Sequence, residues 1–120
     1  MDNGFAESEG MRNLKYLLGI DLGTSGTKTV LFEETGRAVA SETIEYPLYQ
    51  PKNGWAEQEP EDWWNAARDT VKAVIAKSGV KPEDVKGVGI SGQMHGLVLL
   101  DREGRVLRRS ILWCDGRTQE

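Results

Sequence analysis

A turn rich in glycine and hydroxyl residues, set between two short apolar segments, most restricts what this chain can fold into. The turn segment reads Asp21-Leu22-Gly23-Thr24-Ser25-Gly26-Thr27-Lys28. Before it, residues 16–20 form an apolar run typical of a buried strand that ends at Asp21, and after it residues 27–32 alternate as a strand does. The turn therefore joins two strands. This placement excludes a Walker phosphate loop, which precedes a helix and needs Gly-Lys-Ser/Thr.

The same segment has the chemistry of an anion site. Glycines allow backbone N–H groups to approach an anion closely, and successive turn amides can form an anion nest. Thr24 and Ser25 add hydroxyl donors, and Lys28 adds a positive charge. Asp21 could hold Mg²⁺ through water, because that ion keeps several waters and few protein carboxylates. The alternative is a glycine-rich hairpin turn with an exposed aspartate.

The first two thirds of the chain predict a strand meander followed by one helix. Residues 37–46 alternate as a third strand, so two hairpins join three strands, and residues 47–59 are irregular. Pro60 suits the first position of a helix, and Gly79 with Pro82 ends it. Helical spacing predicts one apolar face, with Trp64 in the core, made of Trp64, Ala67, Val71, Val74 and Ile75.

The remaining residues predict a returning strand and a hairpin. We expect residues 85–91 to form a buried strand parallel to the first, and residues 97–100 to pair with 105–107. Residues 111–113 are a last extended piece, and residues 117–120 begin another helix. The fold class is α/β, a mixed β-β-β-α-β sheet followed by a hairpin. The predicted domain is incomplete, because such sheets carry helices on both faces and only one helix is predicted between these strands. Residues 1–15 are assigned as a disordered tail.

Residues 87–92 match the dinucleotide-binding pattern G-x-G-x-x-G in sequence but not in structural context. The glycines lie inside a strand, no helix follows, and no acidic residue stands about twenty positions later. We interpret them as a strand packed closely against a neighbour.

Two further segments carry polar groups suited to a polyol. Gln93, Met94 and His95 follow a strand at its carboxyl end, where open α/β sheets bind ligands. The amide and imidazole could donate hydrogen bonds to hydroxyls, although a loop histidine is often only solvated. Trp113 offers a flat face to a sugar, and Asp115 and Arg117 offer an acceptor and donors. The alternative for these three is a buried tryptophan followed by a helix cap and a surface ion pair.

Composition excludes several functional classes of protein. The 15 basic and 19 acidic side chains give a net charge of −4, without the basic stripe of a nucleic-acid-binding module. The apolar runs are far shorter than the roughly 20 residues of a membrane span. The lone Cys114 excludes a disulfide framework and is interpreted as a packing residue. Trp55 is interpreted as the cover of a core edge, and the alternative is that it lines a site. The first ten residues lack the apolar core of a signal peptide, so we expect a cytoplasmic protein.

These motifs, in this order, resemble the N-terminal part of the FGGY carbohydrate kinases, a family of the actin-like ATPase (ribonuclease H-like) superfamily. Residues 20–28 resemble the superfamily's first phosphate hairpin, and residues 55–64 the family's approach to its first helix. Residues 111–117 resemble its Trp-x-Asp-x-Arg substrate segment. Residues 92–96 resemble the sugar loop of the xylulokinase branch and differ from that of glycerol kinases. The resemblance covers residues 16–120.

The resemblance implies an ATP-dependent sugar kinase that uses Mg²⁺. Asp21 would help place Mg²⁺-ATP through water. The phosphate contacts implied are Gly23, Thr24, Ser25, Thr27 and Lys28, and the sugar contacts are Gln93, Met94, His95, Trp113, Asp115 and Arg117. D-xylulose is the favoured sugar, phosphorylated on its 5-hydroxyl, and other sugars of the family are alternatives.

The resemblance also places the proton-accepting aspartate and the adenosine pocket beyond residue 120. We therefore expect the 120-residue chain alone to be inactive and to self-associate through an open sheet edge. A homodimer of the full protein is the alternative. Two alternatives are a non-catalytic module that binds sugar or phosphate and a ribonuclease H-like nuclease, which would need several acidic residues around two metal ions.

Overall fold

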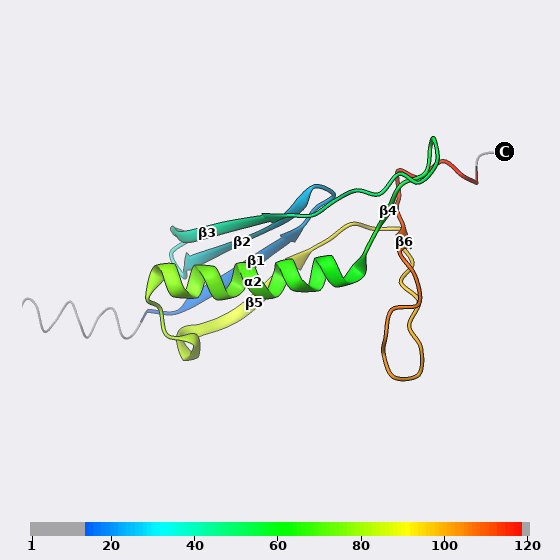
Figure 1. The fold of residues 1–120 in the computed structure, drawn as a ribbon. Coiled ribbons are helices and arrows are strands. Elements are labelled where there is room, and N and C mark those ends of the chain that lie inside the picture. The colour runs from blue at the N-terminus through cyan, green and yellow to red at the C-terminus, as the bar shows by residue number, and fades with distance from the viewer. Residues whose placement is uncertain (1–13, 119–120) are drawn as a thin grey trace, which may run out of the picture.

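The computed structural model describes residues 14–118 and consists of a four-stranded sheet, a long helix and a small second sheet (Figure 1). In chain order the elements are β1 (Tyr16–Leu22), β2 (Gly26–Glu33), β3 (Ala38–Glu45), β4 (Glu57–Gln58), α2 (Pro60–Ser78), the 3-10 turn η1 (Pro82–Asp84), β5 (Val85–Ser91) and β6 (Ser110–Ile111).

The main sheet has the strand order β3-β2-β1-β5 and is mixed. β1 pairs with β2, and β2 with β3, in antiparallel fashion, which confirms the two predicted hairpins. β5 returns parallel to β1, as the crossover through the helix predicted. Asp21 lies opposite Lys28 on one side and Ser91 on the other, so β1 carries its aspartate to the carboxyl end shared with β5.

Helix α2 covers one face of this sheet and forms the core with it (Figure 1). The buried cluster joins Tyr16 and Leu18 of β1, Leu31 of β2 and Val74 of α2. The contacts of α2 go mainly to β2 and β3, so the apolar side chains of β5 on this face lie outside its cover. Val88 and Ile90 are accordingly 57% and 72% exposed, so the prediction that residues 85–91 form a buried strand was wrong about its burial.

The ends of α2 agree with the sequence, and its predicted apolar face agrees in part, since Val74 is in the core and Val71 packs against it. Pro60 occupies the first turn, and Gly79 closes the helix at φ 71°, donating its N–H to the carbonyl of Ile75. The buried positions are Ala66, Thr70 and Val74. The prediction of Trp64 in the core was wrong, because Trp64 stands about 160° around the helix from Ala66 and is 65% exposed.

The predicted hairpin of residues 97–107 is reduced to a loop with one bridge. Leu100 and Val106 form that bridge, and the Leu107 N–H donates to the Leu99 carbonyl at 2.9 Å. The loop projects away from the main sheet (orange, Figure 1), and its leucines are exposed. A two-stranded ribbon with no face to pack on is marginal, which explains why regular strands do not extend here.

The segment predicted to be irregular, residues 47–59, contains β4, which pairs with β6. β1 continues one residue beyond Asp21, to Leu22. Of the glycines at 87, 89 and 92, only Gly87 is closely packed, since a Cβ there would lie 3.1 Å from Leu17 Cδ2. Cys114 is exposed, so the packing interpretation was wrong.

Two predictions about the ends of the chain fall largely outside the described residues. The tail assigned to residues 1–15 is described only at Leu14 and Lys15. Of the helix expected over 117–120, only residues 117 and 118 are described, and they form a turn. Within the described residues, no helix is both long and apolar enough to cross a membrane.

Candidate functional site

The glycine-rich turn is a tight hairpin closed by backbone hydrogen bonding. The Gly23 N–H donates to the Gly26 carbonyl at 2.9 Å, which leaves Thr24 and Ser25 as the two loop residues. Gly26 must lack a side chain, because a Cβ there would stand 2.6 Å from the Ile44 carbonyl oxygen of β3. The glycine therefore lets β3 run alongside the turn without a gap.

Asp21 and Lys28 lie opposite each other on the sheet face that α2 leaves open. With Ser91 at the end of β5 they line a hollow of about 460 Å³. Within residues 14–118 neither side chain forms an ion pair or a hydrogen bond, so both charges remain available. The described residues contain no group of three or more His, Cys, Asp or Glu side chains placed so that they could hold a metal ion. Asp21 therefore fits Mg²⁺ held through water and phosphate oxygens, and does not form an all-protein metal cage.

The carbonyls of Gly23 and Thr24 are turned inward and bound by side chains. The Gly23 carbonyl accepts from the Tyr46 hydroxyl at 2.5 Å and from Gln93 Nε2 at 3.3 Å. The Thr24 carbonyl accepts from Gln58 Nε2 at 2.6 Å. Burial raises the pKa of Tyr46, and the nearby Asp21 carboxylate adds to this. The phenol therefore keeps the proton it donates to Gly23.

A buried amide network extends from these carbonyls. The indole Nε1 of Trp63 donates to Gln58 Oε1 at 2.9 Å, and Gln93 Nε2 donates to the same oxygen at 3.1 Å. Because an indole N–H can only donate, it fixes which end of the fully buried Gln58 amide is oxygen. The Thr24 hydroxyl in turn donates to Gln93 Oε1 at 3.2 Å.

The predicted sugar loop and substrate segment meet at a small cavity. A hollow of about 160 Å³ lies between residues 92–96 and residues 112–113, with Trp63 at its wall. Met94 and Trp113 both line it, although they are 74% and 60% exposed overall. His95 is not among its lining residues, and its backbone adopts φ 66°, a left-handed conformation uncommon for a residue other than glycine.

Asp115 and Arg117 form an internal network instead of facing solvent. Arg117 binds the Asp115 carboxylate through Nε at 2.9 Å and through a terminal nitrogen at 2.8 Å. The same terminal nitrogen reaches Glu57 of β4 at 2.6 Å, and the guanidinium stacks on the Trp55 ring at 3.7 Å. Asp115 also accepts from the Ala56 N–H at 2.6 Å.

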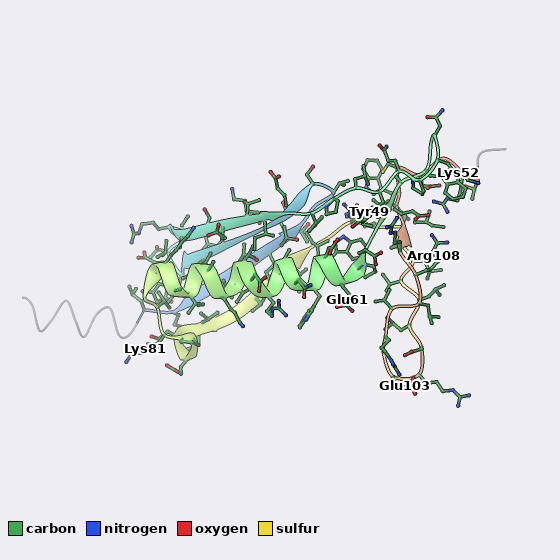
Figure 2. The ribbon with its side chains drawn as sticks, viewed as in Figure 1. Tyr49, Lys52, Glu61, Lys81, Glu103 and Arg108 are labelled. Atoms are coloured by element: carbon green, nitrogen blue, oxygen red, sulfur yellow. The ribbon has the colours of Figure 1, made fainter. Side chains whose placement is uncertain are left out.

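Charge pairing holds both carboxylates of this network ionised. The hydrogen bonds from Arg117 keep the pKa of Asp115 well below its usual range, against the opposing effect of burial. Arg117 and then Arg108 lower the pKa of Glu57 in the same way, and Arg108 reaches it at 2.7 Å. Figure 2 shows Arg108, Tyr49 and Lys52 gathered at the β4–β6 end of the molecule.

The structure thus divides the predicted site residues into groups. Asp21 and Lys28 share one hollow, Met94 and Trp113 share another, and Gln93 touches Thr24 between them. Thr27, predicted to bind phosphate, is fully buried with its hydroxyl on Tyr46 at 3.1 Å. Gln93, predicted to bind sugar, already uses both Nε2 hydrogens within the chain.

Sequence reasoning missed the residues that support this site. Tyr46, Gln58 and Trp63 hold the turn, and Glu57 holds Arg117. Their only local signal is that Glu57, Gln58 and Trp63 flank Pro60 in the segment that approaches the helix.

Known proteins resemble this chain in sequence and in fold. The family model described as "FGGY family of carbohydrate kinases, N-terminal domain" matches residues 16–120. The xylulose kinase of Bacillus subtilis (strain 168) is 48% identical over 105 residues, which are 88% of this chain and 21% of that protein. The chain thus spans about a fifth of the length of the curated relatives it matches.

Solved structures show the same similarity. The crystal structure of a xyloylose kinase from Brucella ovis matches with a TM-score of 0.79 and 44% identity, over 85% of this chain and 22% of that one. The gluconate kinase from Lactobacillus acidophilus matches with a TM-score of 0.79 and 38% identity, over 87% of this chain and 20% of that one.

Proposed function

Because the chain belongs to the FGGY family of carbohydrate kinases, we propose that the protein carrying it transfers the γ-phosphoryl group of ATP to the 5-hydroxyl of D-xylulose. The family consists of ATP-dependent sugar kinases, and the fold is the actin-like α/β fold of its members. The choice of D-xylulose rests on the xylulose kinases among its relatives. A gluconate kinase of comparable similarity keeps other sugar acids and polyols as the second candidate class.

One observation carries the proposal. The glycine-rich turn of residues 23–26 and the loop of residues 92–96 meet at the carboxyl ends of β1 and β5. The Thr24–Gln93 hydrogen bond of 3.2 Å joins them directly. A kinase needs its phosphoryl donor and its acceptor hydroxyl side by side. Phosphoryl transfer depends mainly on such positioning and on charge stabilisation, which a junction of this kind provides.

The chain's own residues then take the following roles. Gly23, Thr24 and Ser25 bind the transferring phosphate, while Asp21 orients the hydrated Mg²⁺ and Lys28 faces the phosphate charge. Mg²⁺, when bound, supplies positive charge to the phosphate oxygens. Met94 and Trp113 provide apolar contact to the sugar, and His95 a hydrogen bond. Thr27 acts through Tyr46 and not on the phosphate itself.

The structure also suggests a change in how three predicted sugar contacts act. Gln93 has one Oε1 lone pair left for a hydroxyl. Asp115 and Arg117 are engaged with each other and with Glu57, so they shape the wall behind Trp113. The proton-accepting carboxylate is proposed to come from the part of the protein after Glu120. The proposal includes a cytoplasmic location, where ATP is available.

The test is ATP consumption by the protein expressed from the complete reading frame that contains this chain. D-xylulose, D-ribulose, L-ribulose, glycerol and gluconate are offered separately. We expect turnover with a preference for D-xylulose, and loss of at least a hundredfold in Asp21→Ala, in line with the weight of charge positioning in such sites. Asp69→Ala, which removes an exposed carboxylate of α2 paired only with Arg68, should leave turnover unchanged.

Two results would redirect the proposal. A preference for gluconate or another sugar would keep the kinase and replace the substrate. Calorimetric binding of a sugar without ATP consumption would favour the non-catalytic binding module. The nuclease alternative needs several acidic residues around two metal ions, and residues 14–118 contain no such group.

A further inference from the structure

The N–H groups of the two loop residues of the glycine-rich turn have no partner within the described residues. Neither the Thr24 N–H nor the Ser25 N–H donates to another part of residues 14–118. These two N–H groups are the backbone donors of the loop that stay unbonded among the described residues, so a bound anion would meet them. The direction of each N–H group is fixed by the carbonyl of the same peptide unit.

Each of the two carbonyls is bound from inside the protein. The Gly23 carbonyl belongs to the same planar unit as the Thr24 N–H, and the Thr24 carbonyl to the same unit as the Ser25 N–H. In a trans peptide the C=O and the N–H point in opposite directions. Tyr46 holds the Gly23 carbonyl at 2.5 Å and Gln58 holds the Thr24 carbonyl at 2.6 Å, so both N–H groups point outward.

The holding side chains are themselves fixed. Trp63 fixes the Gln58 amide, which is fully buried, by donating to its oxygen. The Tyr46 proton goes to a carbonyl, so Thr27, fully buried in β2, must donate to the phenol oxygen. Gln93 adds a second bond to the Gly23 carbonyl at 3.3 Å. Every member has a defined donor and acceptor, which is the condition for a rigid polar network.

We propose that Tyr46 and Gln58 are positioning residues, which hold the two peptide units of the turn so that the N–H groups of Thr24 and Ser25 form a preoriented anion-binding pair. The proposal rests on the proposed function, since that function supplies the phosphate. Amides already oriented toward an anion bind it without the energy of reorganisation, which is why preoriented donors are effective.

The test measures binding and not turnover, with inorganic tripolyphosphate as the probe. Calorimetry gives its Kd for the complete protein and for Tyr46→Phe and Gln58→Met, which remove one carbonyl partner each at nearly constant volume. We expect each variant to weaken binding about five- to tenfold, as the loss of one neutral hydrogen bond that orients a donor does.

A matched control separates positioning from simple destabilisation. Thr70→Val removes a buried hydroxyl between α2 and β2, away from the turn. It should lower the melting temperature and leave the tripolyphosphate Kd unchanged. Tyr46→Phe should also leave the KM for the sugar unchanged, because Tyr46 does not line the cavity beside Met94.

The outcomes for the two proposals are distinguishable. A Kd within twofold of the unaltered protein in both single variants overturns the positioning inference, even if the protein is an active sugar kinase. Absence of any tripolyphosphate binding in the unaltered protein overturns it as well. Weakened binding in the variants of a protein that consumes no ATP supports the inference and contradicts only the proposed function.

Discussion

Among the single residues of the described chain, Asp115 shows most clearly how a buried carboxylate is held. Its carboxylate is 2% exposed and accepts from Arg117 and from the Ala56 N–H. The bonds from Arg117 lower its pKa in the folded protein. The ionised form therefore favours folding above the ordinary aspartate value of about 3.9, and this contribution is lost as the pH falls below that value.

We predict that Asp115→Asn lowers the melting temperature at pH 7, and that the difference from the unaltered protein shrinks toward pH 3. Thermal unfolding followed by circular dichroism between pH 3 and pH 7 measures this. Asp69→Asn, at an exposed carboxylate, serves as the control and should change the melting temperature little at any pH. A deficit for Asp115→Asn of the same size at pH 3 and pH 7 would contradict the linkage argument.

The same residue marks the limit of prediction from sequence at this scale. Asp115 and Arg117 were found because their spacing matches a substrate segment. Their partner Glu57 stands 60 positions before Arg117 and nothing local connects the two. The sequence did not predict the roles of Tyr46 and Gln58 for the same reason. A side chain that holds a carbonyl distant in the chain leaves no periodicity or spacing that would reveal it.

For whole elements, the contact between α2 and β2 depends on a buried pair of hydroxyls. Thr29 and Thr70 are fully buried and their oxygens lie 2.7 Å apart. Thr70 also donates to the Ala67 carbonyl at 3.1 Å, so the bond between the two threonines is donated by Thr29. Thr70→Val then leaves the Thr29 proton buried and unpaired, which costs about 1–3 kcal/mol of unfolding free energy.

We predict that the double variant Thr29→Val/Thr70→Val recovers most of that loss, because two apolar groups of similar shape replace both partners. Urea unfolding of the single and double variants measures the cycle. Equal or additive losses in the double variant would show that the hydroxyls contribute independently, contrary to this interpretation.

These threonines also explain which parts of the elements were predictable. The ends of α2 follow from Pro60 and Gly79, whose conformational preferences act locally. Its buried face followed only in part from counting apolar residues, since its central position is Thr70, whose hydroxyl is buried because Thr29 hydrogen-bonds to it. The strand pair β4–β6 was missed because each member is two residues long and its partner is remote.

On the scale of the whole molecule, we predict that residues 1–120 alone consume no ATP in the presence of D-xylulose. The chain spans about a fifth of the length of the xylulose kinases it matches. Transfer requires a carboxylate that accepts the hydroxyl proton and a site for the nucleotide base, which we place in the remainder of such proteins. A coupled assay for ADP at millimolar sugar tests this, with the complete protein as the positive control. Sugar-dependent ADP production by the 120-residue chain would contradict it.

The outer edge of the main sheet leads to a second prediction for the isolated chain. β5 is an end strand, so one row of its backbone groups is unpaired within residues 14–118. Its side chains Val88 and Ile90 are exposed beside that edge. An uncovered, apolar edge strand is a template for pairing with another chain. We therefore expect the average mass measured by light scattering to rise with protein concentration.

A charge placed on this strand should prevent the association. Ile90 is 72% exposed, so Ile90→Lys can be accommodated without disturbing the core, and a lysine on an edge strand opposes edge-to-edge pairing. Leu107→Lys makes the same change at a 61% exposed residue of the projecting loop, away from β5. We expect Ile90→Lys to remain monomeric at concentrations where the unaltered chain and Leu107→Lys associate. A compact monomer at every concentration of the unaltered chain would show that β5 does not recruit a partner. If Leu107→Lys alone abolished association, the loop leucines and not the sheet edge would be the contact.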